Sequence, residues 1–175
     1  LNQTFQDFEI ILIYDDNNLS DYQFIKKFEE KDQRIKVLKN KNKLGAGLSR
    51  NLAIDISKKK FIAFLDCDDL WKNNKLERQI NFMNKKNINI TYTAYDIIDN
   101  SNRKIGSRLA RETLDFQDLI KSCDIGLSTV ILNSSLLNKY KLFFPRIRTK
   151  EDYVLWLKII KKIKIIMGLD INLTF

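Results

Sequence analysis

An apolar run that ends in a cluster of acids constrains this chain more than any other feature. Residues Phe61 to Leu65 are all apolar and follow three lysines, a pattern typical of a strand buried on both faces of a sheet. The carboxylates of Asp66, Asp68 and Asp69 come directly after this run. A strand of this kind leaves them at the carboxyl edge of an α/β sheet, where such folds bind ligands. Because crowded carboxylates repel one another, a hard divalent cation is the expected counter-charge, and the pattern predicts a metal-bridged phosphate ligand.

Strand patterns and helix patterns alternate along the rest of the chain. Apolar and β-branched runs predict strands at residues 8–14, 34–38, 61–65, 88–95, 128–132 and 164–167. Helical spacing predicts a helix capped by Ser20 or Asp21 and further helices over residues 46–58, 73–86, 116–121 and 151–162. Residues 97–112 are polar and are expected to be irregular. This alternation predicts an α/β fold, with a mainly parallel sheet and helices on both faces, in a single domain of residues 1–175.

The composition excludes several kinds of active site. Histidine is absent, which rules out Ser-His-Asp and Cys-His catalysis and the zinc sites that contain histidine. The two cysteines, Cys67 and Cys123, have neither a metal-ligand spacing nor a disulfide pattern, which fits a reducing cytosol. Acid–base chemistry near neutral pH therefore falls mostly to carboxylates, lysine or tyrosine.

The net charge of +9 suggests an anionic partner: nucleic acid, a membrane surface or a phosphorylated substrate. The lysines are spread through helices and turns, whereas a nucleic-acid footprint needs basic residues gathered on one face. We therefore interpret most of the charge as a solvated surface and expect no nucleic-acid partner. No apolar stretch reaches the roughly 20 residues that span a bilayer, so we expect peripheral association with an anionic membrane at most.

The glycine-rich segment Gly45 to Arg50 begins like the fingerprint of a dinucleotide-binding site, with Asp66 about 20 residues further on. Arg50, however, stands where that fingerprint has a third glycine for close packing of helix and strand. The strand that follows also ends in three carboxylates, where one would suffice for a ribose. Both departures argue against a dehydrogenase.

Two further acidic pairs can be explained either by local structure or by function. Asp15 and Asp16 follow the first strand, where aspartates commonly bond their own backbone in a turn; alternatively, one of them accepts a hydrogen bond from a base or a ribose hydroxyl. Glu151 and Asp152 fall in the first turn of a predicted helix, a position that the helix dipole favours for acids. The local patterns leave both explanations open.

Three segments taken together resemble the family 2 glycosyltransferases, which are inverting nucleotide-sugar enzymes of the GT-A fold, a Rossmann-like α/β architecture. The segments are QTFQDFEII at residues 3–11, GAGLSRN at residues 45–51, and FLDCDDLW at residues 64–71 followed by KLE at residues 75–77. The similarity covers residues 1–83 and resumes at residues 127–137 and at 151–157. The family's first strand would lie before Leu1, and the resemblance implies a catalytic domain that is truncated at both ends.

The resemblance also implies a role for each matching residue. The roles are Asp15 or Asp16 at the uracil, Arg50 near the nucleotide, Asp66 near the ribose and the metal, Asp68 on the metal, and Asp152, with Glu151 as the alternative, as catalytic base. The acidic pair of the family is usually followed by Gly-Ser, whereas Asn17 and Asn18 follow it here.

Residues and resemblance together lead us to expect a transferase that builds a bacterial surface polysaccharide. Mn²⁺ or Mg²⁺ would bridge Asp68 and the diphosphate of a UDP-linked sugar, and Asp152 would take the proton of the acceptor hydroxyl in one inverting displacement. The expected partners are the donor and a glycan or lipid-linked acceptor, and the expected location is the cytoplasm, at the inner face of the membrane.

Two other functions stay open. A sugar-nucleotide nucleotidyltransferase would need a glycine-rich triphosphate loop after its first strand. A non-catalytic basic binding module would need basic and aromatic residues interleaved on one face.

Overall fold

A computed structural model describes all 175 residues, which form two compact units. Unit 1 consists of Leu1–Gln6, Lys60–Leu142 and Trp156–Phe175, and unit 2 consists of Asp7–Lys59 and Phe143–Leu155. Each unit thus combines segments that are distant in the sequence.

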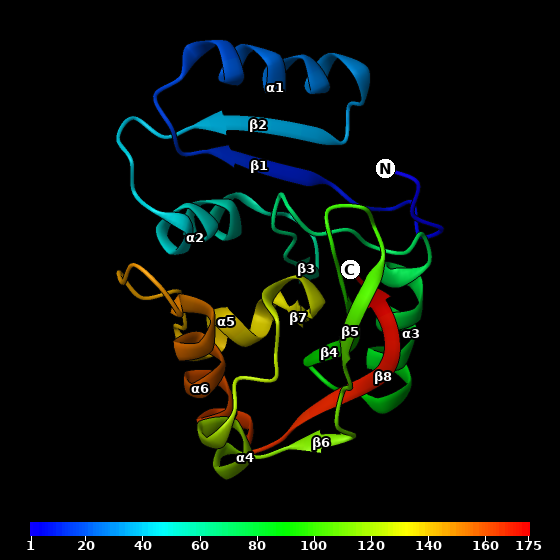
Figure 1. Cartoon of the computed structure of the whole chain (residues 1–175). Helices are drawn as coiled ribbons and strands as arrows, with labels where there is room; N and C mark the ends of the chain where they lie inside the picture. Colours follow the sequence, from blue (N-terminus) through cyan, green and yellow to red (C-terminus); the bar gives the residue numbers. More distant parts are fainter. The chain divides into compact units, whose positions relative to one another are not determined.

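Unit 2 is built on a strand–helix–strand motif. Strands β1 (Ile10–Tyr14) and β2 (Ile35–Lys39) pair in parallel, and α1 (Leu19–Lys31) connects them. Parallel strands need such a crossover because a tight turn cannot join them. Helix α2 (Ala46–Ile56) follows β2, and Figure 1 shows α1 lying along β2 while α2 lies on the side of β1.

Helix α1 is capped by a different residue from the one expected. The Asn18 side chain accepts the backbone N–H groups of Ser20 and Asp21, at 3.0 and 3.4 Å, so Asn18 is the N-cap. The expectation of Ser20 or Asp21 was wrong because Asn18 already satisfies the N–H groups exposed at this helix end.

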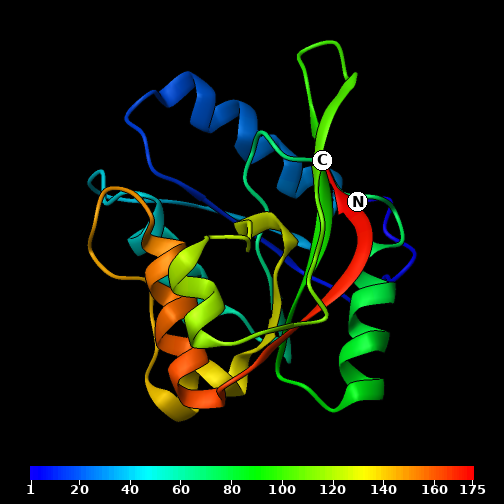
Figure 2. The same cartoon turned by 60° about the horizontal axis from the view of Figure 1, so that its bottom comes forward.

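Unit 1 holds a six-stranded sheet. Its strands are β3 (Phe61–Ala63), β4 (Ile90–Ile98), β5 (Lys104–Arg108), β6 (Thr113–Leu114), β7 (Ile131–Asn133) and β8 (Ile166–Thr174), in the spatial order β3-β7-β4-β8-β6 with β5 on β4. Strands β4 and β8 run in parallel, and Figure 2 shows β8 (red) alongside β4 (green). The other pairings, β3–β7, β4–β7, β4–β5 and β6–β8, are antiparallel, so the sheet is mixed.

Helices flank this sheet and contribute side chains to the core. They are α3 (Lys75–Lys86), α4 (Phe116–Lys121), the 3₁₀ helix η1 (Leu127–Thr129), α5 (Ser134–Tyr140) and α6 (Glu151–Ile163), of which α6 begins in unit 2 and continues in unit 1. Trp156, Tyr92, Met83 and Leu132 are among the fully buried side chains. The expected α/β class, a sheet flanked by helices, is confirmed.

Three local expectations were wrong. Leu65 is 50% exposed although Ile62 and Phe64 are buried, so the run before the acids is not buried on both faces along its whole length. The segment expected to be irregular contains β5, and the strand expected at residues 128–132 begins only at Ile131, after η1. Strand β5 has few β-forming residues and owes its conformation to pairing with β4.

Candidate functional site

Asp15 anchors a loop in unit 2. Its carboxylate follows β1 and accepts hydrogen bonds from the backbone N–H groups of Leu44 (2.8 Å) and Gly45 (2.6 Å) and from the Asn40 side chain (2.6 Å). Partial burial works against the charged form, but these hydrogen bonds together hold the pKa of Asp15 below its usual value. Asp15 therefore fixes the loop between β2 and α2, a role that its local sequence did not indicate.

Asp16 is arranged differently from its neighbour. It is exposed, accepts the backbone N–H of Asn17 at 2.6 Å and lies 3.4 Å from the Lys43 Nζ. The bond from Asn17 and the lysine beside it lower the pKa of Asp16. Of the two acids, Asp16 is the one whose side chain reaches solvent beside a cation.

The first turn of α2 requires its glycines. Gly45, the N-cap, has a φ of +86°, in the left-handed region that favours glycine. A Cβ on Gly47 would lie 3.1 Å from the Glu151 Cγ and 3.2 Å from the Pro145 carbonyl oxygen, closer than ordinary contact. These glycines therefore let α2 approach the segment that leads into α6.

An ion pair joins the Arg-Asn dipeptide of α2 to the start of α6. The Arg50 guanidinium lies 2.7 Å from the Glu151 carboxylate, and both side chains are largely buried. Arg50 also lies over the Phe144 ring, 5.6 Å from its centroid. The Asn51 amide donates to the Phe144 carbonyl oxygen and accepts from its N–H, both at 2.9 Å. Together Arg50 and Asn51 fix the segment that carries Glu151.

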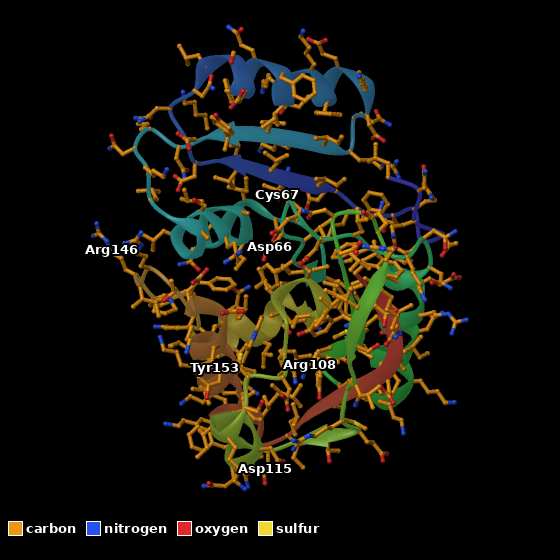
Figure 3. All side chains as sticks on the ribbon, in the orientation of Figure 1. Asp66, Cys67, Arg108, Asp115, Arg146 and Tyr153 are labelled. Carbon is orange, nitrogen blue, oxygen red and sulfur yellow. The ribbon has the colours of Figure 1, made fainter.

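Asp152 follows Glu151 in the sequence and has a raised pKa. Its carboxylate is half-buried and accepts the N–H of Tyr153 at 2.7 Å, in the turn of α6 that Figure 3 marks with Tyr153. Burial raises the pKa of Asp152, and the negative charge of Glu151 adds to this, although Arg50 opposes it. Asp152 is thus a half-buried acid of raised pKa, a property suited to acid–base chemistry.

A hollow of about 300 Å³ adjoins the first turn of α2. Its lining consists of residues 43–48 and 145–148 of unit 2. Lys43, Arg146 and Arg148 are its charged members, so the lining is basic, and the N–H groups at a helix start add to the attraction for an anion. Figure 3 shows Arg146 extending outward from the loop before α6.

The acidic tetrad, residues Asp66, Cys67, Asp68 and Asp69 of unit 1, is supported by Ser128. The Asp66 N–H donates to the Ser128 Oγ at 2.9 Å, and the Trp71 indole donates to the Ser128 carbonyl oxygen at 2.8 Å. Burial raises the pKa of Asp69, the charges of Asp68 and Asp66 raise it further, and a hydrogen bond with Ser128 opposes them. The Asp68 side chain is exposed, and Figure 3 shows Asp66 and Cys67 on this loop.

Comparison with known proteins identifies the family. Residues 1–143 match Glycosyl transferase family 2. The chain belongs to this family. The match goes against both the nucleotidyltransferase and the binding module as alternatives.

Curated members of the family are similar to nearly the whole chain. It is 44% identical, over 92% of its length, to UDP-Glc:alpha-D-GlcNAc-diphosphoundecaprenol beta-1,3-glucosyltransferase WfgD of Escherichia coli. It is 30% identical, over 93% of its length, to the putative teichuronic acid biosynthesis glycosyltransferase TuaG of Bacillus subtilis (strain 168). The chain spans 61% and 64% of the length of these two relatives.

Solved structures of similar fold confirm the GT-A architecture. S. aureus TarS 1–349, in complex with UDP, superposes with a TM-score of 0.80 at 21% identity, over 99% of this chain and 52% of that one. The mannosyltransferase PcManGT from Pyrobaculum calidifontis, in complex with GDP-Man and Mn²⁺, gives a TM-score of 0.70 at 10% identity, over 98% of this chain and 48% of that one. None of the helices in this family 2 chain combines the length and the apolar character needed to cross a bilayer.

The predicted site residues fall into two groups. Unit 2 holds Asp15, Asp16, Arg50, Glu151 and Asp152, and unit 1 holds Asp66 and Asp68. Within unit 2 the structure brings Arg50 and Glu151 into contact, although 100 residues separate them in the sequence. The basic lining of the hollow was not predicted from the sequence, although the closely spaced Arg146 and Arg148 were an available signal.

The residues of unit 1 fit the divalent metal that the family resemblance implies. Asp66 and Asp68 offer hard oxygen atoms, and their negative charges add to the burial that raises the pKa of Asp69. No group of three or more His, Cys, Asp or Glu side chains is arranged to hold a metal ion. In proteins Mg²⁺ is usually bound through one or two carboxylates together with substrate phosphates.

Proposed function

We propose that this chain transfers a sugar from a UDP-linked donor to a hydroxyl group of a lipid-linked glycan, with inversion, during synthesis of a bacterial surface polysaccharide. Relatives named for UDP-Glc, for a diphosphoundecaprenol acceptor and for teichuronic acid synthesis support the donor and acceptor classes. The observation that carries the chemistry is the raised pKa of Asp152 beside a Glu151 that is already paired.

Asp152 is the catalytic base in this proposal. A carboxylate whose pKa is raised above its usual value accepts a proton more readily, which is what the acceptor hydroxyl requires as it attacks the sugar. Glu151 is less suited to this role because its carboxylate is held by Arg50. Arg50 and Glu151 instead position the turn that carries Asp152.

The nucleotide contacts divide between the two aspartates after β1. Asp15 shapes the loop, since its oxygen atoms accept three N–H groups of that loop. Asp16, which is exposed, is the better candidate for a hydrogen bond to the uracil. Asp66 is proposed to lie near the ribose.

Asp68, with Asp66 as its neighbour, is proposed to hold Mn²⁺ or Mg²⁺ together with the diphosphate. When bound, such an ion offsets the charge that develops on the departing UDP. The protein's own contribution is to place the two carboxylates on one loop, whose backbone is restrained by the bond from the Asp66 N–H to the Ser128 hydroxyl.

We also propose one catalytic domain over residues 1–175, located in the cytoplasm at the inner face of the membrane. The family match over residues 1–143 includes segments of both units, which supports a single domain. The net charge of +9 and the lipid-linked acceptor named for the Escherichia coli relative support the location.

Transfer assays with the full-length protein test the function. UDP-glucose and UDP-N-acetylglucosamine would be offered as donors, with diphosphoundecaprenol-linked N-acetylglucosamine as acceptor, in the presence of Mn²⁺ or EDTA. We expect metal-dependent formation of a glycosylated lipid whose new linkage has the opposite anomeric configuration to the donor. Retention of the donor configuration, or transfer from no UDP-sugar, would refute the proposal.

A further inference from the structure

A fully buried lysine lies behind the acidic tetrad in unit 1. Lys75, the first residue of α3, is 0% exposed. Its Nζ donates to the Gln79 Oε1 at 2.5 Å and to the Thr129 carbonyl oxygen at 3.2 Å, and no carboxylate lies within ion-pair distance. A buried lysine without an acidic partner is rare, because removing its charge from water is costly. An apolar side chain of the same length would avoid that cost, so the amine needs an explanation.

The partners of Lys75 connect it to the tetrad. The Thr129 carbonyl oxygen accepts from Lys75 and also from the Gln79 Nε2, at 2.8 Å. The adjacent residue, Ser128, accepts the Asp66 N–H through its hydroxyl and lowers the pKa of the Asp69 carboxyl. Ser128 and Thr129 are both buried. Thr129 contacts the lysine and Ser128 contacts the acidic loop, so the two residues connect them.

Trp71 forms a second connection. Its indole N–H donates to the Ser128 carbonyl oxygen at 2.8 Å, while the Lys75 Nζ lies 5.0 Å from the ring centroid. Trp71 closes the chain segment that begins with Asp66, so both ends of the acidic loop are tied to Ser128. Lys75 contacts Thr129 directly and faces the ring of Trp71.

We propose that Lys75 is a positioning residue: through Thr129 and Trp71 it fixes the loop of Asp66 and Asp68, and thereby sets the affinity for UDP in the presence of a divalent ion. This inference rests on the proposed function, because it assigns Asp66 and Asp68 to metal and nucleotide. Burial lowers the pKa of Lys75 to about 7, so the amine loses much of its charge near neutral pH, and its neutral form still has two N–H donors for Gln79 and Thr129.

The test compares three variants of the full-length protein. Lys75→Met keeps the length of the side chain but removes the donors, and Lys75→Gln restores a donor without charge. Lys85→Met, at the exposed end of the same helix, is the matched control. Calorimetry would measure UDP binding with Mn²⁺ and with EDTA, and ¹H–¹⁵N resonances of the Asp66 amide and the Trp71 indole would report on the loop without metal.

We expect Lys75→Met to weaken UDP binding about tenfold with Mn²⁺ and to leave binding in EDTA unchanged, as for other residues that orient metal ligands. Both resonances should shift in Lys75→Met and return towards their wild-type positions in Lys75→Gln, while Lys85→Met changes nothing. Equal loss of UDP binding with and without Mn²⁺, or unshifted resonances, would overturn the inference.

Two further outcomes are decisive. If Lys75→Met fails to fold, Trp71→Phe provides the same comparison, because it keeps a ring beside the amine but removes the bond to Ser128. We then expect Mn²⁺ to strengthen UDP binding less in Trp71→Phe than in the wild type, and an equal strengthening would refute the proposal. If the wild type itself binds no UDP, the proposed function fails, whereas the resonance comparison still decides whether Lys75 fixes the loop.

Discussion

The pairing, pKa and burial of several residues in this chain differ from what their residue type alone suggests. Glu151 and Asp152 are neighbours in one helical turn, yet Arg50 neutralises the first while burial raises the pKa of the second. Lys75, of a type that is almost always exposed, is fully buried. These differences arise from tertiary contacts. The sequence therefore predicted both acids as candidate bases, but it could not decide between them and did not predict the burial of Lys75.

Lys75 should make stability depend on pH. Its pKa is about 7 in the folded state against an ordinary value of 10.5, so between these pH values the unfolded chain binds more protons. Stability therefore rises with pH through this window, by at most about 1.4 kcal/mol per pH unit. Urea denaturation of the wild type and Lys75→Met from pH 6.5 to 10 checks this. The free energy of unfolding of the wild type minus that of Lys75→Met should rise with pH. A difference that does not change with pH would show that Lys75 is not buried as described.

At the scale of elements, the sequence predicted what depends on local pattern. Helix α4 and the start of α6 lie where spacing placed them, and the acidic residues do follow β1 and β3. Strand β5 was missed because its partner β4 creates it. Helix α5 was missed although Asn133 before two serines offered a capping signal: its side chain accepts the Ser135 N–H at 3.0 Å.

The loop between β2 and α2 depends on Asp15. Replacing Asp15 by Asn removes a charged acceptor of three N–H bonds and turns an NH₂ group towards one of them. We expect a loss of about 1.5–3 kcal/mol in the free energy of unfolding, measured by urea denaturation at pH 7. The matched variant Asp16→Asn, on the exposed neighbour, should change stability by less than about 0.5 kcal/mol. Equal effects of the two variants would contradict the anchoring role of Asp15.

The stabilising effect of Asp15 should also disappear in acid. Because its folded pKa is lowered, the stability that it contributes is present above the unfolded pKa of 3.8 and is lost as the pH falls through the folded value. The stability difference between wild type and Asp15→Asn should therefore shrink below pH 4. A difference that stays constant down to pH 2 would argue against this.

For the whole molecule, the proposed location depends on its positive charge. A chain of net charge +9 should bind anionic vesicles through electrostatic attraction that salt screens. Flotation with phosphatidylglycerol vesicles should show binding at low salt that falls as the salt concentration rises. Neutral phosphatidylcholine vesicles are the control, and absence of binding at low salt would contradict the proposed location.

The proposed mechanism depends on Asp152 removing the acceptor proton. In the full-length enzyme, Asp152→Asn should keep UDP affinity and stability while turnover falls about 10²- to 10⁴-fold. Glu151→Gln removes one negative charge from the same turn and should lower turnover less, because it disturbs only the ion pair with Arg50. Steady-state kinetics of both variants, with calorimetry of UDP binding, make the comparison. Near-normal turnover of Asp152→Asn would contradict the account, and a large loss in Glu151→Gln alone would assign the base to Glu151.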